Sequence, residues 1–111
     1  MMDQHLQAFL EEARELLTEL ENTLIELEED SENSDLLDQA FRAMHTIKGS
    51  SGMFGCEDVA MFTHNIESVY DYIRNGELKI TKEIMDLTLS AKDQIAVMLF
   101  GKSLGKEVNE K

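Results

Sequence analysis

The chain of 111 residues contains no proline and a single cysteine, Cys56. Proline interrupts helices, so its absence leaves long helices possible, and the abundant leucine, glutamate, alanine, methionine and lysine favour them. One cysteine cannot form an intrachain disulfide, and it fits a reducing compartment. A chain of this length is expected to form one domain with a single modest core.

Basic residues are scarce, with 10 lysines and arginines against 23 acidic residues and a formal net charge of -13. Such a charge repels polyanions, which argues against nucleic acid and anionic membrane surfaces as partners. No apolar run approaches the roughly 20 residues that span a bilayer, and no basic segment leads into an apolar one at the N-terminus. We therefore expect no membrane insertion, no secretory signal and a cytoplasmic protein.

Apolar residues recur at helical spacing in four segments, and strand alternation, internal repeats and a Walker phosphate loop are not seen. The predicted helices span residues 3–30, 34–54, 57–75 and 82–100, with Ser34 and Thr81 as N-caps and with Gly55 and Gly76 as stops. The predicted core positions include Leu17, Leu20 and Leu24 of the first helix, Met44, Ile47 and Phe54 of the second, Val59, Ile66 and Ile73 of the third, and Leu87, Ile95 and Leu99 of the fourth.

Four amphipathic helices joined by short connections predict an all-α, antiparallel up-down four-helix bundle. We assign residues 1–102 to this bundle. Residues 103–111 are polar and are expected to form a tail, the start of a linker or a short fifth C-terminal helix. No second exposed apolar stripe argues for a dimer, so the domain is expected to be monomeric.

The second predicted helix carries a histidine, a lysine and two glycines along one edge. His45 follows an apolar position and should therefore lie at the border of the buried stripe. Lys48 and Gly49 lie three and four residues further on and share its face. A glycine inside a helix costs about 1 kcal/mol relative to alanine, so Gly49 and Gly52 suggest the close approach of another body.

The third predicted helix is expected to place His64 and Glu67 beside His45 and Lys48 of the second. In an antiparallel pair, His45 and His64 lie at similar heights, 10 residues before and 9 residues after Gly55. His64 and Glu67 share a face at i and i+3. The sequence therefore predicts a surface cluster of His45, Lys48, His64 and Glu67 in the groove between these two helices.

One chemical interpretation of this cluster is nucleophilic attack by a neutral imidazole, with Glu67 fixing the tautomer of His45 and Lys48 attracting a phosphoryl group. The plainer interpretation is a polar helix surface with an exposed Lys48–Glu67 ion pair, which would contribute only about 0–1 kcal/mol. A metal site is disfavoured because the lysine cation would oppose the ion. A hydrolase triad is disfavoured too, because no Ser or Cys is placed with a base and an oxyanion site.

Residues 45–51, with the sequence HTIKGSS, resemble the signature His-x-Ile/Leu-Lys-Gly-Ser/Ala-Ser/Ala of histidine phosphotransfer (HPt) domains. A longer match over residues 40–55, 63–67 and 76–78 is similar to the N-terminal phosphoacceptor domain of chemotaxis kinases of the CheA family. The resemblance spans roughly residues 3–100.

The resemblance implies that His45 is the phosphorylated residue and that Glu67 hydrogen-bonds its other ring nitrogen, with Lys48 and His64 completing a polar network. The phosphate would come from ATP on a separate kinase domain and pass to an aspartate of a response regulator. The surface around His45, including Gly49 and Gly52, would receive these partners. No cofactor and no metal are expected in this chain.

Two alternatives remain open from the sequence. The kinase, dimerisation and coupling domains of CheA-like proteins are not among these 111 residues, so the chain is either a fragment of a longer kinase or a free-standing phosphorelay protein. Without a nucleotide site it should not phosphorylate itself from ATP. From a different functional class, a helical-bundle adaptor without catalytic function would bind partners and carry no phosphate.

Overall fold

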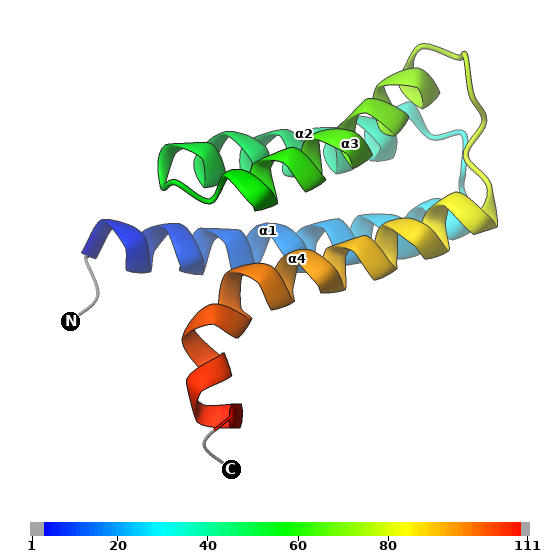
Figure 1. Cartoon of the computed structure of the whole chain (residues 1–111). Coiled ribbons are helices and arrows are strands. Elements are labelled where there is room, and N and C mark those ends of the chain that lie inside the picture. Colours follow the sequence, from blue (N-terminus) through cyan, green and yellow to red (C-terminus); the bar gives the residue numbers. More distant parts are fainter. Residues whose placement is uncertain (1–3, 110–111) are drawn as a thin grey trace.

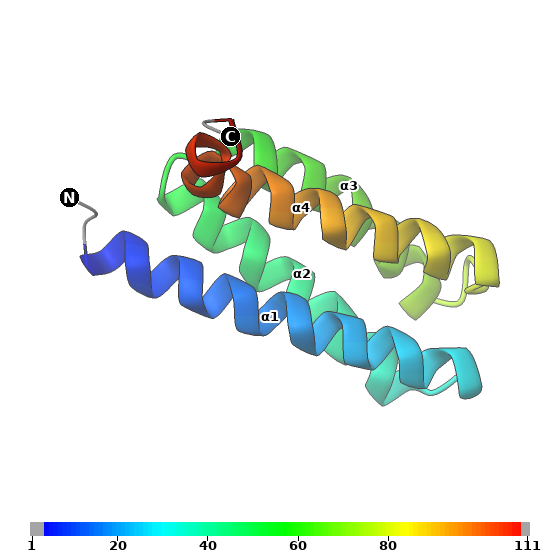
Figure 2. The same ribbon diagram turned by 90° about the horizontal axis from the view of Figure 1, so that it is seen from below.

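The computed structural model contains four consecutive helices, and it describes the backbone of residues 4–109 and the side chains of residues 4–101 (Figure 1). The helices are α1 (Gln4–Glu29), α2 (Ser34–Met53), α3 (Glu57–Arg74) and α4 (Lys82–Asn109). Each helix runs opposite to the one before it. Seen from below, α1 and α4 lie in front of α2 and α3 (Figure 2).

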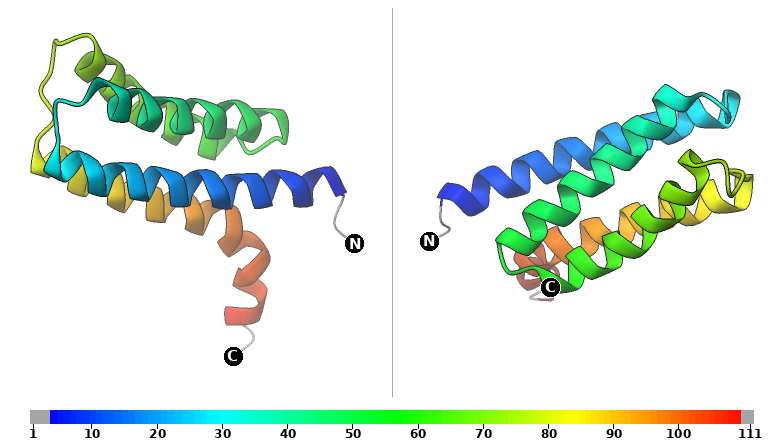
Figure 3. Two further views of the ribbon diagram at one scale, coloured as in Figure 1. Left: turned by 180° about the vertical axis from the view of Figure 1, so that it is seen from behind. Right: turned by 90° about the horizontal axis from the view of Figure 1, so that it is seen from above.

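The arrangement is an antiparallel up-down bundle in which α2 packs on α3 and α1 packs on both α2 and α4 (Figure 3). Residues 4–109 contain no strand, so the predicted all-α bundle is confirmed. None of the helices in this range combines the length and the apolar composition that crossing a bilayer requires.

The helix ends follow from turn and capping residues. Gly55 and Gly76 have φ angles of 76° and 80°, the left-handed conformation that glycine adopts at low cost after a helix. Thr81 accepts a hydrogen bond from the backbone N–H of Ile84 at 3.2 Å, as expected for the cap of α4. The prediction of Ser34 as the cap of α2 is wrong. Asn33 Oδ1 instead accepts from two backbone N–H groups in the first turn.

Replacing Asn33 by alanine should lower the free energy of unfolding by about 1 kcal/mol, because both N–H groups would lose their side-chain acceptor. Urea unfolding followed by circular dichroism measures the change. Ser34→Ala is the matched control and should change little, since Ser34 is exposed and is not the cap. Equal losses in the two variants would contradict the assignment of the cap.

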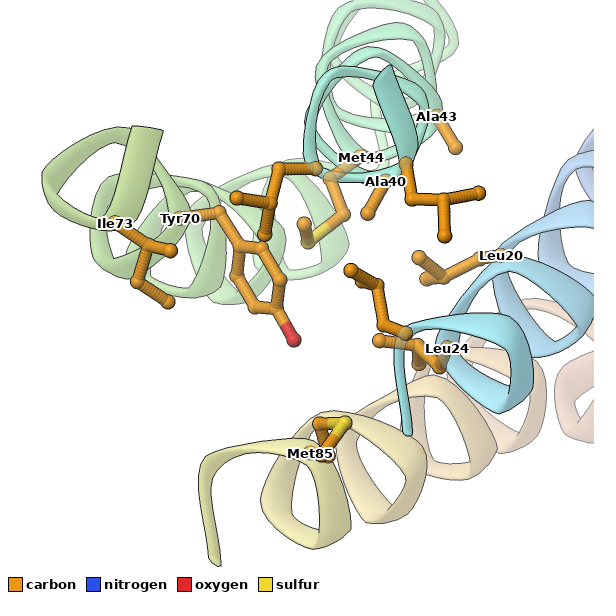
Figure 4. Close-up of a cluster of buried hydrophobic side chains, with 11 residues drawn as sticks. Leu20, Leu24, Ala40, Ala43, Met44, Tyr70, Ile73 and Met85 are labelled. Carbon is orange, nitrogen blue, oxygen red and sulfur yellow. The ribbon is translucent and has the colours of Figure 1, made fainter. Parts of the chain in front are cut away.

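All four helices contribute to the core, as the close-up of one half shows (Figure 4). Leu20 and Leu24 of α1 face Met44 of α2 and Tyr70 of α3, all at most 1% exposed. The buried Tyr70 hydroxyl lies 2.8 Å from Thr88 Oγ1 and joins α3 to α4. Burial raises the pKa of Tyr70 to about 12 although the hydrogen bond opposes the shift, so this phenol stays neutral at physiological pH.

Several predicted core positions are wrong. Leu87 is 69% exposed, and Phe54 is 37% exposed and lies beyond the last turn of α2 as its C-cap. In α3, the predicted Ile66 does pack against the core but is only partly buried, and polar Thr63 and Glu67 are buried more deeply. The helices carry apolar residues over a wide arc. The packing of their neighbours, and not periodicity alone, selects the innermost positions.

The predicted end of the fourth helix near residue 100 is also wrong, because α4 continues to Asn109. Its last turns bend away from the bundle (Figure 1). Residues 102–109 are therefore a continuation of α4 and not a separate fifth helix; residues 110–111 lie outside the described part, as does residue 3 of the predicted first helix. The division between bundle and linker at residue 102 stays a prediction.

Candidate functional site

His45 lies at the edge of the buried face of α2. Its neighbours Met44 and Ile47 are fully buried, whereas the His45 side chain is 61% exposed. A helix that buries one stripe against α1 and α3 leaves a residue one position further round at the border with solvent. The imidazole is therefore anchored at its base by the core, and its ring is open to a partner.

Glu67 of α3 is the centre of the polar cluster. One of its carboxylate oxygens, Oε2, lies 2.5 Å from Nδ1 of His45. The other, Oε1, accepts a hydrogen bond from Nζ of Lys48 at 2.7 Å and lies 3.5 Å from Nδ1 of His64. The structure therefore brings together all four polar residues that the sequence singled out.

The expectation of a surface cluster is wrong for its central member. The Glu67 side chain is 6% exposed, against 26% for Lys48 and 55% for His64. Glu67 lies one turn after Thr63 and one turn before Tyr70, both fully buried, so it occupies the inward seam of α3. A carboxylate in such a position is stable only when its oxygens are hydrogen-bonded and its charge is compensated.

The neighbours of Glu67 decide its protonation. Burial by itself raises the pKa of Glu67, but hydrogen bonds and electrostatic interactions with Lys48 and His45 together outweigh it, and the pKa lies below its ordinary value of 4.5. The carboxylate is therefore ionised at neutral pH and acts as a fixed acceptor.

This lowered pKa predicts an acid-dependent contribution to stability. A carboxyl group whose pKa is lower in the folded chain stabilises the fold above its unfolded pKa, and the contribution is lost as pH falls through the folded value. The free energy of unfolding of the wild type should therefore decrease relative to that of Glu67→Gln as pH falls below about 4.5. Urea titrations at several pH values measure this, and a difference that does not change with pH would contradict it.

The Glu67 contact also determines the tautomer of His45. A carboxylate can only accept, so Nδ1 of His45 carries the proton that points at Oε2. In a neutral ring the remaining nitrogen, Nε2, then keeps its lone pair. The arrangement is that of a nucleophile oriented by a buried base partner, on a ring that is mostly exposed.

A hollow of about 310 Å³ opens beside the ring of His45 between α2 and α3. It is lined by Phe41, His45, His64, Glu67, Ser68, Asp71, Tyr72, Asn75 and Glu77. Gly49 and Gly52 are exposed one and two turns further along α2, and a Cβ atom added at either would meet no atom within 4 Å. Packing inside this chain therefore does not require glycine at these two positions.

Two ring contacts at this site were not predicted from the sequence. The rings of Phe41 and His45 lie nearly parallel, with 6.1 Å between centroids and 10° between planes. The guanidinium carbon of Arg74 lies 4.2 Å from the centroid of Phe41 on α2. The spacing of four residues between Phe41 and His45 was the available signal, but it also fits a simple core position.

Among the described residues, no three or more His, Cys, Asp or Glu side chains are grouped so that they could hold a metal ion.

The chain is similar in sequence to chemotaxis proteins. The chemotaxis protein CheA of Borreliella burgdorferi is 45% identical over 94 residues, which are 85% of this chain and 11% of that protein. CheA of Halobacterium salinarum is 40% identical over 98 residues, which are 88% of this chain and 15% of that protein. The chain therefore spans only a small part of the length of these relatives.

Solved structures of CheA domains have the same fold as this chain. The CheA phosphotransferase domain from Thermotoga maritima superposes with a TM-score of 0.86 and 36% identity, over 92% of this chain and 99% of that one. The phosphorylated P1 domain of CheA3, in complex with CheY6 from R. sphaeroides, gives a TM-score of 0.85 and 25% identity, over 95% and 82%. The Hpt domain family model matches residues 4–99. The chain thus belongs to the family of histidine phosphotransfer (Hpt) domains.

Proposed function

We propose that this chain is the phosphoacceptor domain of a two-component signalling system and that Nε2 of His45 carries the phosphoryl group. One observation carries the proposal. The buried carboxylate of Glu67 binds Nδ1 of His45 at 2.5 Å, which leaves Nε2 as the unprotonated nitrogen of an exposed ring.

The chemical step follows from that arrangement. The Nε2 lone pair attacks the γ-phosphorus of ATP held on a kinase domain, a nitrogen–phosphorus bond forms, and the bond to the leaving oxygen of ADP breaks. The ring gains positive charge as it forms the new bond, because Nδ1 keeps its proton. The Glu67 carboxylate lies against that proton and stabilises the charge as it develops.

The other two polar residues have supporting roles in this proposal. The Lys48 ammonium compensates the buried Glu67 charge at 2.7 Å and adds a cation close to the acceptor ring, which favours an approaching phosphoryl group. His64 lies 3.5 Å from the same carboxylate and completes the polar environment. Each of these groups acts on the ring of His45 directly or through Glu67.

The phosphoryl group then passes to an aspartate of a response regulator. In that step the aspartate oxygen attacks the phosphorus, the nitrogen–phosphorus bond breaks, and the lone pair returns to Nε2. The solved complex of the phosphorylated P1 domain of CheA3 with CheY6 supports a receiver of this class as the partner. The relatives named chemotaxis protein CheA support a chemotaxis pathway, and the relative named sensor histidine kinase CheAY supports a kinase domain as the donor.

The proposed setting is the cytoplasm, with residues 1–102 as the N-terminal domain of a longer CheA-like kinase and residues 103–111 leading into a linker. The length of the relatives supports this setting over a free-standing phosphorelay protein. The polar cluster supports it over an adaptor without chemistry, since an adaptor has no need of a buried carboxylate aimed at an exposed imidazole.

The test is phosphorylation of the purified chain by a CheA kinase from which its own phosphoacceptor domain has been removed, with labelled ATP. Phosphoramidate serves as a second donor that needs no protein docking. The expected product carries acid-labile, alkali-stable phosphate, which mass spectrometry places on His45. A chain that stays unlabelled by both donors, or that carries the label elsewhere, would overturn the proposal.

A further prediction concerns the open face beside the ring. Gly49→Leu should slow transfer from the kinase domain by about 10- to 100-fold, because the new side chain occupies the space that a partner enters. Labelling by phosphoramidate should stay near wild type. The fold should gain about 0.5–1 kcal/mol of stability from the higher helix propensity.

The matched control for Gly49→Leu adds bulk elsewhere. Ala8 is exposed on α1, and Ala8→Leu should leave both labelling rates unchanged. Wild-type transfer from the kinase domain to Gly49→Leu would show that partners do not approach over this part of α2.

A further inference from the structure

We propose that Phe41 is a positioning residue that holds the imidazole plane of His45, and that Arg74 of α3 holds Phe41 in turn. This inference rests on the proposed function, because it concerns the geometry of the same acceptor nitrogen. It adds a second constraint on the ring to the one that Glu67 supplies.

One hydrogen bond does not fix the orientation of an imidazole. The contact between Nδ1 of His45 and Oε2 of Glu67 determines which nitrogen is free, but the ring can still turn about the direction of that bond. The plane of the ring sets the direction in which the Nε2 lone pair points. An in-line attack on phosphorus requires that direction to be held.

The ring of Phe41 supplies the missing constraint. It lies one helical turn before His45 on α2, and the two rings are nearly parallel, with 10° between their planes and 6.1 Å between their centroids. This is an offset stacked arrangement, which aromatic pairs prefer over a face-to-face sandwich. Turning the imidazole out of this plane would remove the contact.

Phe41 is itself held from two sides. Its inner part packs against the core cluster of the bundle, which limits its own rotation. Its ring also faces the Arg74 guanidinium at 4.2 Å, a cation–π contact between the last turn of α3 and α2. Arg74 Nε donates a hydrogen bond to Asp38 Oδ1 at 2.8 Å, so the guanidinium is fixed to α2 as well.

The result is a continuous row of contacts from Asp38 through Arg74 and Phe41 to His45. The row approaches the imidazole along α2 from the end opposite to Gly49 and Gly52, because Phe41 precedes His45 and the glycines follow it. It therefore restrains the ring without covering the glycine side, over which we propose that partners approach.

The experiment compares Phe41→Leu, which keeps an apolar side chain but removes the planar face, with Phe41→Tyr, which keeps that face. Two readouts are needed. NMR of the His45 ring protons and carbons reports the ring-current shift and the mobility of the imidazole. The rate of labelling by phosphoramidate reports the reactivity of Nε2 without any protein docking.

We expect Phe41→Leu to remove the ring-current shift of His45, to increase its ring mobility and to slow labelling by about threefold to tenfold. Phe41→Tyr should leave the ring-current shift, the ring mobility and the labelling rate at their wild-type values. Arg74→Met should change them in the same direction by a smaller factor, because Phe41 keeps its contact with the core. Phe62→Leu is the matched control, since Phe62 is also a partly buried phenylalanine packed against the core but does not line the hollow beside His45, and the His45 signals and labelling rate of this variant should equal those of the wild type.

Unchanged His45 signals in Phe41→Leu would overturn the inference, and so would changed signals with an unchanged labelling rate. A slow rate in Phe41→Leu that Phe41→Tyr does not restore would also overturn it, because the loss would then not follow from the planar face. Failure of the proposed function is distinguishable, since it appears as an unlabelled His45 in the wild type, while the ring signals still decide whether Phe41 holds the imidazole.

Discussion

Replacing His45 by glutamine should abolish acid-labile phosphorylation of this chain by both a kinase domain and phosphoramidate. Glutamine has a similar length and polarity, but its amide nitrogen has no available lone pair, so the nucleophile is removed while the helix is kept. His45 is largely exposed, and the fold should therefore remain intact by circular dichroism. The expected loss of label is complete.

His64→Gln is the matched comparison, because His64 is also about half exposed and lies beside the same carboxylate. We expect this variant to be labelled at His45, with a rate lowered by less than about tenfold, because the ring that it loses does not carry the phosphoryl group. If His45→Gln kept the label and His64→Gln lost it, the roles of the two histidines would have to be exchanged.

Replacing Glu67 by glutamine should slow phosphorylation of His45 by about 100-fold while leaving the bundle folded. The reason is the proton on His45. The carboxylate can only accept, which keeps the proton on Nδ1, whereas an amide can donate its own N–H to Nδ1 and move the ring proton to Nε2. In that tautomer the attacking nitrogen has no lone pair, and the charge that stabilises the phosphorylated ring is also lost.

Rapid-quench labelling with phosphoramidate measures the effect on the ring alone, and labelling by the kinase domain measures it in the complete reaction. The ¹⁵N shifts of His45 report the tautomer directly and should show more protonation at Nε2 in the variant. Glu15→Gln, at an exposed position of α1, removes the same charge without touching the ring and should react like the wild type. Wild-type kinetics in Glu67→Gln would remove Glu67 from the mechanism.

The helical framework could be predicted because its signals are local. Three local signals placed the four helices to within a few residues, apart from the end of α4. They are the absence of proline, the glycines at positions 55 and 76 and the spacing of leucines in the first segment. The grouping of His45, Lys48, His64 and Glu67 could be predicted as well. Two neighbouring antiparallel helices with a short turn bring residues at equal distance from that turn to the same height.

Positions that depend on competition between neighbouring groups could not be predicted in this way. Asn33 and Ser34 are both good caps, and the structure shows which of them meets the first free N–H groups. Leu87 fits the apolar spacing of α4, yet Met85 and Thr88 occupy the buried side and leave Leu87 in solvent. Periodicity identifies an apolar arc, and only packing against other helices selects its centre.

By itself, the sequence determined the class of this protein, its four helices and the four polar side chains that meet between α2 and α3. Only the tertiary structure decided that Glu67 is buried while the ring of His45 is exposed, and that Phe41 and Arg74 lie beside that ring. The physical reason is that burial and ring contacts depend on how α3 is rotated against α2. That rotation follows from the fit of the whole core, which local sequence patterns do not encode.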